Sequence, residues 1–288
     1  RDAMVVNIPE AVTVERPVNV IFYNCGIEST VNYPRIFLIA NRNSRVSVIE
    51  SYVGDEAHSS LTNSVSEIVG HEGSVIDHYR ILDESEHVFN IGYGRVMLAE
   101  RSSFRSTSFY KSAKIGRYDL NVCLNGTDVS CELNGLYSTS GSSHMDNYIN
   151  VDHAKPNGRS DLLYKGILDG KSRAVFGGTV LVRRDAQKTE STQSDKNLVL
   201  SSQAEIDSKP ALYIYADDVK CAHGATAGNI DADTIFYMRS RGLDLGTASR
   251  LLIYGFAEEI IDKVRIPGLR KHLEEGFLSS LPNHRFEF

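Results

Sequence analysis

The sequence has no tryptophan, only 7 prolines in 288 residues and no long apolar run. No stretch approaches the roughly 18 uninterrupted apolar residues that a membrane helix needs. The four cysteines at positions 25, 123, 131 and 221 are too few and too scattered for a disulfide framework or a CxxC zinc site. We therefore expect a reducing compartment. The net charge of −6 argues against nucleic acid as the main partner.

Most of the chain consists of short runs in which apolar and polar residues alternate, the pattern of half-buried strands. Proline, which removes a ladder donor, is rare, since only Pro156 occurs between Pro34 and Pro210. Turn-forming Gly, Ser and Asn recur at roughly 8- to 14-residue intervals. The predicted strand runs are 18–23, 35–40, 45–50, 74–82, 103–110, 118–124, 129–133, 161–164, 179–182 and 198–200.

This spacing suits a β-sandwich, a barrel or a β-solenoid. The solenoid is favoured because the turns are not mainly the Asn-Gly pairs of tight hairpins. About 200 residues of uniform strand pattern is also long for one sandwich, whereas a parallel β-helix grows by stacking coils. Many outward positions carry Ser, Thr, Asn or His, as in stacked polar ladders. We predict a mainly β protein in which residues 1–228 form a parallel β-helix core.

The pattern changes at the end of this region. Asp231 can cap a helix that ends at Gly242. Either Asp244 or Thr247 can begin a second helix, whose apolar residues follow the 3.6-residue period until a proline interrupts it. A shorter third helix follows. We predict a C-terminal α-helical subdomain over 229–288 that caps one end of the β-helix, where the last coil would otherwise expose a strand edge.

The sharpest chemical signal is the tripeptide Cys221-Ala222-His223. If this segment is extended, Cys221 and His223 lie at i and i+2 and therefore on one face of a strand. A soft thiolate beside an imidazole suits zinc, copper or iron–sulfur species. Two ligands are too few for a closed site, so a second chain or an exchangeable ligand has to supply the rest. The alternative is a small buried cysteine beside a structural histidine.

Other candidates have plainer interpretations. Asp217 and Asp218 are adjacent, would point to opposite faces of a strand, and better fit a capped turn than an acid/base pair. Arg239 and Arg241 can bind an acidic partner or complement the C-terminal dipole of their helix. No P-loop, GxGxxG or GxSxG motif predicts nucleotide binding or hydrolysis. Surface or ladder roles are predicted for most of the histidines at 58, 71, 78, 87, 144 and 153.

The segment from Tyr215 to Thr226, YADDVKCAHGAT, and the segment IFYMRSRG that ends at Gly242 resemble a known family. They are similar to the signature of the SufD branch of the SufB/SufD family, which acts in iron–sulfur cluster assembly. Upstream segments agree, including GKSRAVFGG from Gly170 and QKTE from Gln187. The resemblance is specific from about residue 165 to 262 and weaker over the earlier strands.

The resemblance implies a right-handed parallel β-helix with a C-terminal helical domain, and a non-catalytic scaffold rather than an enzyme. It implies a SufBCD complex in which this chain pairs with SufB, each binds the ATPase SufC, and a transient iron–sulfur cluster forms at the SufB–SufD interface. Cys221 and His223 fall at that interface, where SufB would bring further ligands. The terminal helices would dock SufC. Partner contacts are assigned to Phe236, Tyr237, Arg239 and Arg241.

The resemblance to the SufB/SufD family leads to three further expectations. The isolated chain should hold no cofactor and form a homodimer through residues of about 200–225, because a free strand edge is a ready pairing site. The compartment is the bacterial cytosol, or the plastid stroma in a eukaryote. The chain opens at Arg1 without a secretory segment, and the N-terminal helical region of the family is expected to be missing.

A rival from another class is a β-helix carbohydrate-active enzyme, such as a polysaccharide lyase or hydrolase. Such enzymes need a groove lined by carboxylates and basic residues. The absence of tryptophan, a frequent sugar-stacking residue, counts against this rival. A third possibility is a paralogue that acts alone as a homodimer. Co-purification discriminates, because a scaffold should bring down SufB and SufC and a lyase should not.

Overall fold

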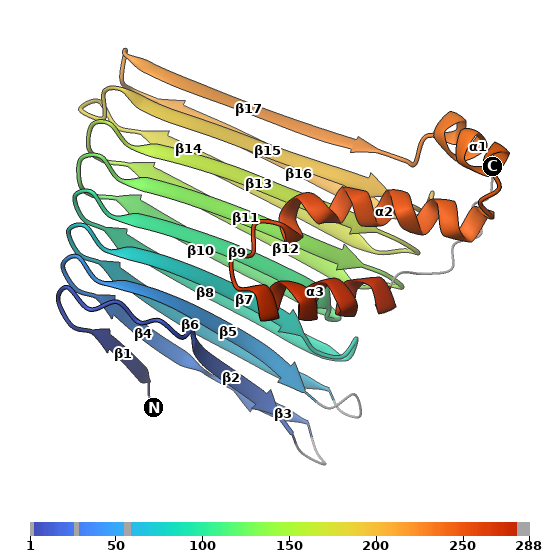
Figure 1. Cartoon of the computed structure of the whole chain (residues 1–288), viewed down its shortest axis with the longest axis horizontal. Helices are drawn as coiled ribbons and strands as arrows, with labels where there is room; N and C mark the ends of the chain where they lie inside the picture. The colour runs from blue at the N-terminus through green and yellow to red at the C-terminus, as the bar shows by residue number, and fades with distance from the viewer. Residues whose placement is uncertain (1–2, 26–28, 55–58, 281–288) are drawn as a thin grey trace.

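The computed structural model describes residues 3–25, 29–54 and 59–280, which form a two-sheet β-solenoid followed by three helices (Figure 1). Each coil contributes one strand to each of two stacked sheets. Within the described residues every strand pairing is parallel. The parallel stacking confirms the predicted solenoid and excludes an antiparallel sandwich.

The strands divide into two sheets, here called sheet A and sheet B. In spatial order, sheet A contains β1 (Met4–Ile8), β4 (Arg35–Ala40), β6 (Ser60–Gly70), β8 (Val88–Leu98), β10 (Ile115–Leu124), β12 (His144–His153), β14 (Arg173–Val182) and β16 (Glu205–Ile214), with β3 (Thr30–Asn32) also beside β6. Sheet B contains β2 (Val18–Asn24), β5 (Arg45–Gly54), β7 (Val75–Asp83), β9 (Ser103–Ser112), β11 (Ser130–Thr139), β13 (Arg159–Leu168), β15 (Thr189–Val199) and β17 (Val219–Gly228).

A continuous apolar core fills the space between the two sheets. Alternate residues of each strand point inward, as in β14, where Phe176 and Val180 are fully buried. Large inward rings are accommodated by glycines on neighbouring strands. A Cβ added to Gly135 would lie 2.3 Å from the ring of Tyr164. Burial of each large apolar side chain stabilises the folded chain by about 1.5–3 kcal/mol. The stacked coils share one extended core, so this stabilisation is spread along the solenoid.

Each predicted strand run overlaps an observed strand, but most strands are longer than predicted. Strands β6, β8 and β12 were missed because their inward residues include polar side chains and glycines. Examples are Ser64 and Ser66 in β6, Gly92 and Gly94 in β8, and Asn147 in β12. The apolar half of the alternation is therefore interrupted, although the strands pair along their full length.

Three helices follow the last strand: α1 (Ala232–Ser240), α2 (Leu245–Ile261) and α3 (Pro267–Ser280). Asp231 caps α1 by accepting from the backbone N–H of Thr234, as predicted. Asp244 caps α2 by accepting from the backbone N–H of Thr247, so of the two helix starts that the sequence allowed, Asp244 is the observed one. Gly242 follows α1 with a φ of 96°, where glycine is favoured. No helix in the described ranges is long and apolar enough to cross a membrane.

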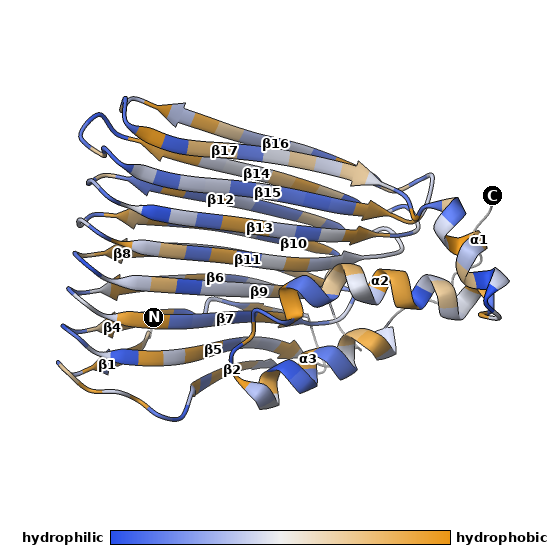
Figure 2. Ribbon diagram, turned by 45° about the horizontal axis from the view of Figure 1, so that its top comes forward, coloured by the Kyte–Doolittle hydropathy of each residue, from blue (hydrophilic) through white to orange (hydrophobic). Residues whose placement is uncertain are grey.

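The predicted placement of the helices at the end of the solenoid was wrong. Both α2 and α3 lie across the outer face of sheet B (Figures 1 and 2). Five successive strands of sheet B present outward apolar side chains that pack with the apolar sides of these helices. They are Ile49, Tyr79, Ile81, Phe109, Leu136, Leu163 and Ile167. Covering this apolar face removes more hydrocarbon from water than covering a polar backbone edge would, so the edge of the last coil stays open.

Lys165 anchors α2 to sheet B from a buried position. The residue is 4% exposed. Its Nζ donates to the carbonyl oxygen of Phe256 at 2.8 Å and lies 2.5 Å from the carboxylate of Glu259. The ammonium also sits 4.5 Å from the centroid of the Phe256 ring. A lysine is buried to this degree only when its charge is paired, so these contacts fix the position of α2.

The change Lys165→Met should lower the free energy of unfolding by about 1–3 kcal/mol, because it removes the charged hydrogen bond to the Phe256 carbonyl and the ion pair with Glu259. Urea denaturation measures the effect. Lys196→Met is the matched control, since the Lys196 Nζ lies 3.5 Å from the same Glu259 but its side chain is 41% exposed. The control should change stability by less than about 0.5 kcal/mol. Equal effects of the two substitutions would contradict the anchoring role.

Candidate functional site

The predicted pair Cys221 and His223 lies on β17, the edge strand of sheet B at the open end of the solenoid. In the sheet, β17 pairs with β15 alone among the described strands. Cys221 lies beside Ser191 and His223 beside Gln193, and both β15 residues are buried inward. The pair is therefore on the inward-directed face of the last coil, which confirms the predicted extended conformation of this segment.

The two side chains differ in environment. Cys221 is half-buried and packs against the apolar core, and burial raises the pKa of its thiol. His223 is exposed at the open end. In the described part of the chain, no three His, Cys, Asp or Glu side chains lie close enough together to hold a metal ion. The pair thus offers one soft and one borderline ligand in an incomplete set.

The same end of the solenoid exposes aromatic side chains from sheet A. Tyr213 of β16 is 53% exposed and Tyr215, just after this strand, is 63% exposed. Asp217 and Asp218 lie in the bend that connects β16 to β17. The backbone N–H of Asp218 donates to Oε1 of Gln187 at 2.9 Å, in keeping with the predicted turn. The open end therefore combines free backbone edges with exposed apolar surface, which is typical of a contact surface.

A row of buried polar side chains lies on β15 beneath the open end, and sequence reasoning did not identify it. Asp195 is fully buried, and its Oδ2 accepts hydrogen bonds from Ser208 at 2.6 Å and from Asn197 at 2.7 Å. Its Oδ1 has no partner among the described residues, nor has either amide atom of Gln193. Burial raises the pKa of Asp195 to about 6, although the hydrogen bonds from Ser208 and Asn197 oppose this shift.

The sequence of β15 does not mark this row. Ser191, Gln193, Asp195 and Asn197 are polar, but so are Thr192, Ser194 and Lys196 between them. A half-buried strand is recognised by an apolar row that alternates with a polar one, and no such alternation occurs before Leu198. In β15 the row that contains Asp195 is the inward one. Which of the two polar rows is buried is visible only once the direction of the strand is known.

A second buried polar cluster lies deep inside the solenoid, around Glu50 of β5. Its carboxylate contacts Arg80, His78 and Tyr52, all of which are buried. The Arg80 guanidinium also lies over the ring of Tyr52, 4.2 Å from the centroid. Burial alone would raise the pKa of Glu50, but the charge of Arg80 and the hydrogen bonds from His78 and Tyr52 outweigh it and lower the pKa to about 2. This carboxylate is ionised and paired.

Two histidines depart from the predicted surface or ladder roles. His78 is 2% exposed and belongs to the Glu50 cluster. His153 is fully buried, its Nε2 is 2.8 Å from Oγ of Ser160, and burial lowers its pKa to about 4. Both point inward, a direction that a histidine within an alternating run does not reveal. His58 lies outside the described residues.

The residues assigned to partner contacts lie on or directly after α1. Phe236 is 74% exposed and Tyr237 is 58% exposed. Arg239 lies in the last turn of α1, where a cation complements the helix dipole. The guanidinium of Arg241 lies over the Tyr237 ring, 5.1 Å from its centroid. Helix α1 therefore presents an apolar and cationic surface to solvent.

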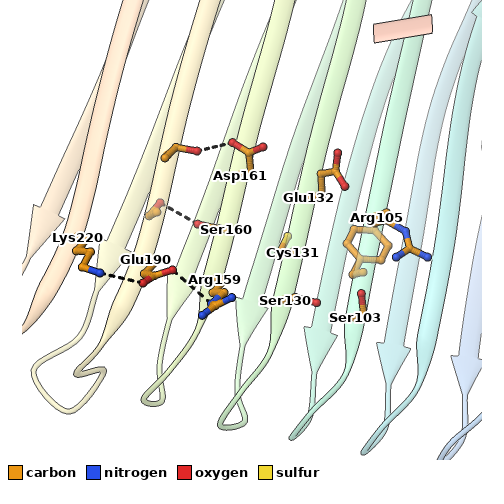
Figure 3. A pocket seen from close by; sticks show the side chains of 13 residues that line it. Ser103, Arg105, Ser130, Cys131, Glu132, Arg159, Ser160, Asp161, Glu190 and Lys220 are labelled. Carbon is orange, nitrogen blue, oxygen red and sulfur yellow. Dashed lines mark hydrogen bonds and ion pairs between the residues drawn. The ribbon is translucent and has the colours of Figure 1, made fainter. Parts of the chain in front are cut away.

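A groove of about 560 Å³ crosses the first residues of β9, β11, β13, β15 and β17 (Figure 3). Its charged side chains contact one another, since Arg159 and Lys220 both pair with Glu190. Asp161 accepts a hydrogen bond from Thr192. This is the kind of charged groove that the carbohydrate-active rival requires, but its charges are engaged in cross-strand ladder contacts.

Comparison with known proteins agrees with this arrangement. The model of the SUF system FeS cluster assembly SufBD core domain matches residues 22–256. The chain is 33% identical over 283 residues to an iron–sulfur cluster assembly SufBD family protein of Synechocystis, covering 95% of this chain and 62% of that protein. It is 33% identical over 270 residues to the chloroplastic protein ABCI7 of Arabidopsis thaliana, covering 91% and 57%.

It is also 32% identical over 257 residues to the iron–sulfur cluster assembly protein SufD of Escherichia coli, covering 89% of this chain and 61% of that protein. The chain thus spans roughly three fifths of the length of these relatives. The matched core includes the stacked strands from β2 onward, the Cys221 and His223 edge, α1 and most of α2. The chain therefore belongs to the SufBD family of iron–sulfur cluster assembly proteins.

Proposed function

We propose that this chain is the SufD-type scaffold subunit of a SufBCD complex, and that it pairs with SufB through the open end of the solenoid. The observation that carries the proposal is the incomplete ligand pair, Cys221 and His223, on a free edge strand of a SufBD family protein. A partner that extends the sheets from β16 and β17 would bring its own side chains beside this pair and complete the ligand set. An iron–sulfur cluster is then a transient substrate of the interface.

The terminal helices provide the proposed contact with the ATPase SufC. Helix α1 exposes Phe236 and Tyr237 beside two arginines, so it offers both apolar area and charge to a partner. Helix α2 connects that surface to the solenoid through the Lys165 anchor. A movement of SufC bound to α1 would therefore be transmitted through α2 and its Lys165 contact to sheet B. The compartment we propose is reducing, either the bacterial cytosol or the plastid stroma, and the four cysteines are free.

Reconstitution tests the function directly. The chain should be co-expressed with SufB and SufC, purified as a complex, and supplied anaerobically with ferrous iron and sulfide. We expect both partners to co-purify and the visible absorption of an iron–sulfur cluster to develop. Failure of SufB and SufC to co-purify with a folded chain would contradict the scaffold role. Cleavage of a polysaccharide by the chain alone would favour the carbohydrate-active rival.

In isolation, the chain should form a homodimer through the segment 200–225, which imitates the contact with SufB. Tyr215→Asp should weaken this dimer by at least about tenfold, because it places a charge in the contact surface. Tyr33→Asp is the control, since Tyr33 is 67% exposed at the opposite end of the solenoid. Analytical ultracentrifugation at micromolar concentration measures both. A monomeric unmodified chain, or equal weakening by the two substitutions, would contradict the assignment.

A further inference from the structure

Among the described residues, the carboxylates of Glu50 and Asp195 are at most 1% exposed, and they differ in the groups that surround them. Glu50 is paired with Arg80 and bonded by His78. Asp195 has only neutral hydrogen-bond donors, Ser208 and Asn197, and its Oδ1 is buried without a partner. A carboxylate taken out of water without a countercharge is unfavourable. Such a group in the last enclosed row of the core therefore calls for a cation, and no cationic side chain of the described residues is bonded to it.

The strand above Asp195 leaves space for that cation. In register, Ala225 of β17 lies beside Asp195 and Ala227 lies beside Asn197. Both alanines belong to the inward-directed row of β17, as their partners do in β15. Small side chains therefore cover this stretch of the inward row of β15. On the inward-directed face of β17, the nearest group that can ligate a cation is the imidazole of His223.

The spacing of the two groups fits a single bridging ion. Adjacent strands are about 4.8 Å apart and residues i and i+2 about 6.6 Å apart, which puts the Cα atoms of His223 and Asp195 about 8 Å apart. Metal–nitrogen and metal–oxygen bonds are each about 2.0–2.2 Å long. The two side chains can therefore reach one ion from neighbouring strands. The unpartnered amide of Gln193 projects from the same inward row, beside His223 in register.

We propose that Asp195 is an additional ligand for iron, which holds a ferrous ion together with His223 at the open end of the solenoid before cluster formation. This inference rests on the proposed function, since it concerns the same site. Imidazole and carboxylate together suit Fe²⁺ among the available divalent ions. A bare ion also needs less room than an inserted lysine or arginine side chain, which fits a site covered by the methyl groups of Ala225 and Ala227.

Metal binding to the isolated chain tests the proposal without cluster assembly. Co²⁺ replaces Fe²⁺ under anaerobic conditions, and its visible absorption is titrated against the unmodified chain and two variants. Asp195→Asn keeps the shape of the side chain and removes the charge, and should weaken Co²⁺ binding by at least about tenfold. Asp207→Asn is the control, because Asp207 lies on the neighbouring β16 and pairs outward with Arg173. It should leave Co²⁺ binding unchanged.

Several outcomes would overturn the proposal. The unmodified chain could fail to bind Co²⁺, or Asp195→Asn could bind Co²⁺ as tightly as the unmodified chain does. Asp195→Asn could also change only the unfolding midpoint or dimer formation and leave Co²⁺ binding as it is. The last outcome would assign the carboxylate to folding or to a cationic group of the partner. Cluster assembly distinguishes failure of this proposal from failure of the proposed function. If His223→Ala blocks assembly and Asp195→Asn does not, the role of Asp195 as an iron ligand is contradicted and the proposed function is not. If neither substitution blocks assembly, the proposed function of the β17 edge is contradicted as well.

Discussion

His223→Ala should reduce cluster assembly in the reconstituted complex by at least about tenfold while leaving the unfolding midpoint of the chain unchanged. The reason for the loss is that water cannot replace an imidazole with the same geometry in a shared metal site. The reason for unchanged stability is that His223 is exposed on an edge strand. The development of visible absorption after addition of iron and sulfide measures the first effect, and thermal denaturation the second.

His71→Ala is the matched control, because His71 is an exposed histidine in a turn of the same solenoid. It should alter neither quantity. Cys221→Ser adds a second comparison: loss of assembly would assign the thiol a ligand or relay role, whereas a modest loss of stability alone would fit the packing of Cys221 against the core. Normal assembly by a folded His223→Ala complex that retains both partners would refute the proposed role of this edge.

The largest expected effect on stability comes from Arg80→Met, which should lower the free energy of unfolding by about 3–5 kcal/mol. The change leaves the carboxylate of Glu50 fully buried without its countercharge. It also removes the guanidinium from between the rings of Tyr52 and Tyr118, where it lies 4.2 and 4.6 Å from the ring centroids. Chemical denaturation of the isolated chain measures the effect.

The double change Glu50→Gln with Arg80→Met separates charge from packing. Removing both charges should recover part of the loss, because no unpaired ion then remains in the core. If the double variant is less stable than Arg80→Met alone, packing rather than charge is the dominant contribution. Exposed pairs such as Arg173 with Asp207 should each contribute at most about 1 kcal/mol.

The same cluster predicts a pH dependence of stability. The pKa of Glu50 is lowered to about 2 in the folded chain, from about 4.3 in an unfolded one. Its contribution is therefore fully present above pH 4.3 or so and is lost as the pH falls towards 2. In Glu50→Gln, this part of the acid sensitivity should be absent. An identical loss of stability between pH 4 and 2 in both proteins would contradict the lowered pKa.

The sequence predicted the stacking direction and the helices because both depend on local patterns. Asp231 and Asp244 precede apolar residues at helical spacing, and each does cap a helix. Cys221 and His223 were singled out as a candidate pair because two residues with metal chemistry stand at i and i+2 in one short segment; the structure bears out their shared face, and their role stays a prediction. The resemblance of that segment to a known family then supplied the interface reading, which spacing alone left open.

The interior polar groups were not predictable in the same way. Glu50, His78 and Arg80 meet only because β5 and β7 stack in register, and residues one coil apart in sequence become neighbours. The direction of Asp195 depends on the same register. The position of α2 and α3 also escaped prediction, since it follows from outward apolar residues scattered over five strands. Long-range contacts of this kind leave no periodic signal within one segment.

The location of α2 and α3 has a consequence for how the protein unfolds. In a solenoid each coil contacts only its neighbours, so coils can detach one after another from a free end. Here one apolar cluster joins the two helices to strands from β5 at Ile49 to β13 at Ile167, and Leu198 of β15 packs against it. Because α2 and α3 contact several coils at once, these coils should unfold together as one cooperative unit. In the described part of the chain, the apolar cluster includes no residue of β16 or β17. The edge that carries His223 therefore belongs to the coil that can unfold locally most easily.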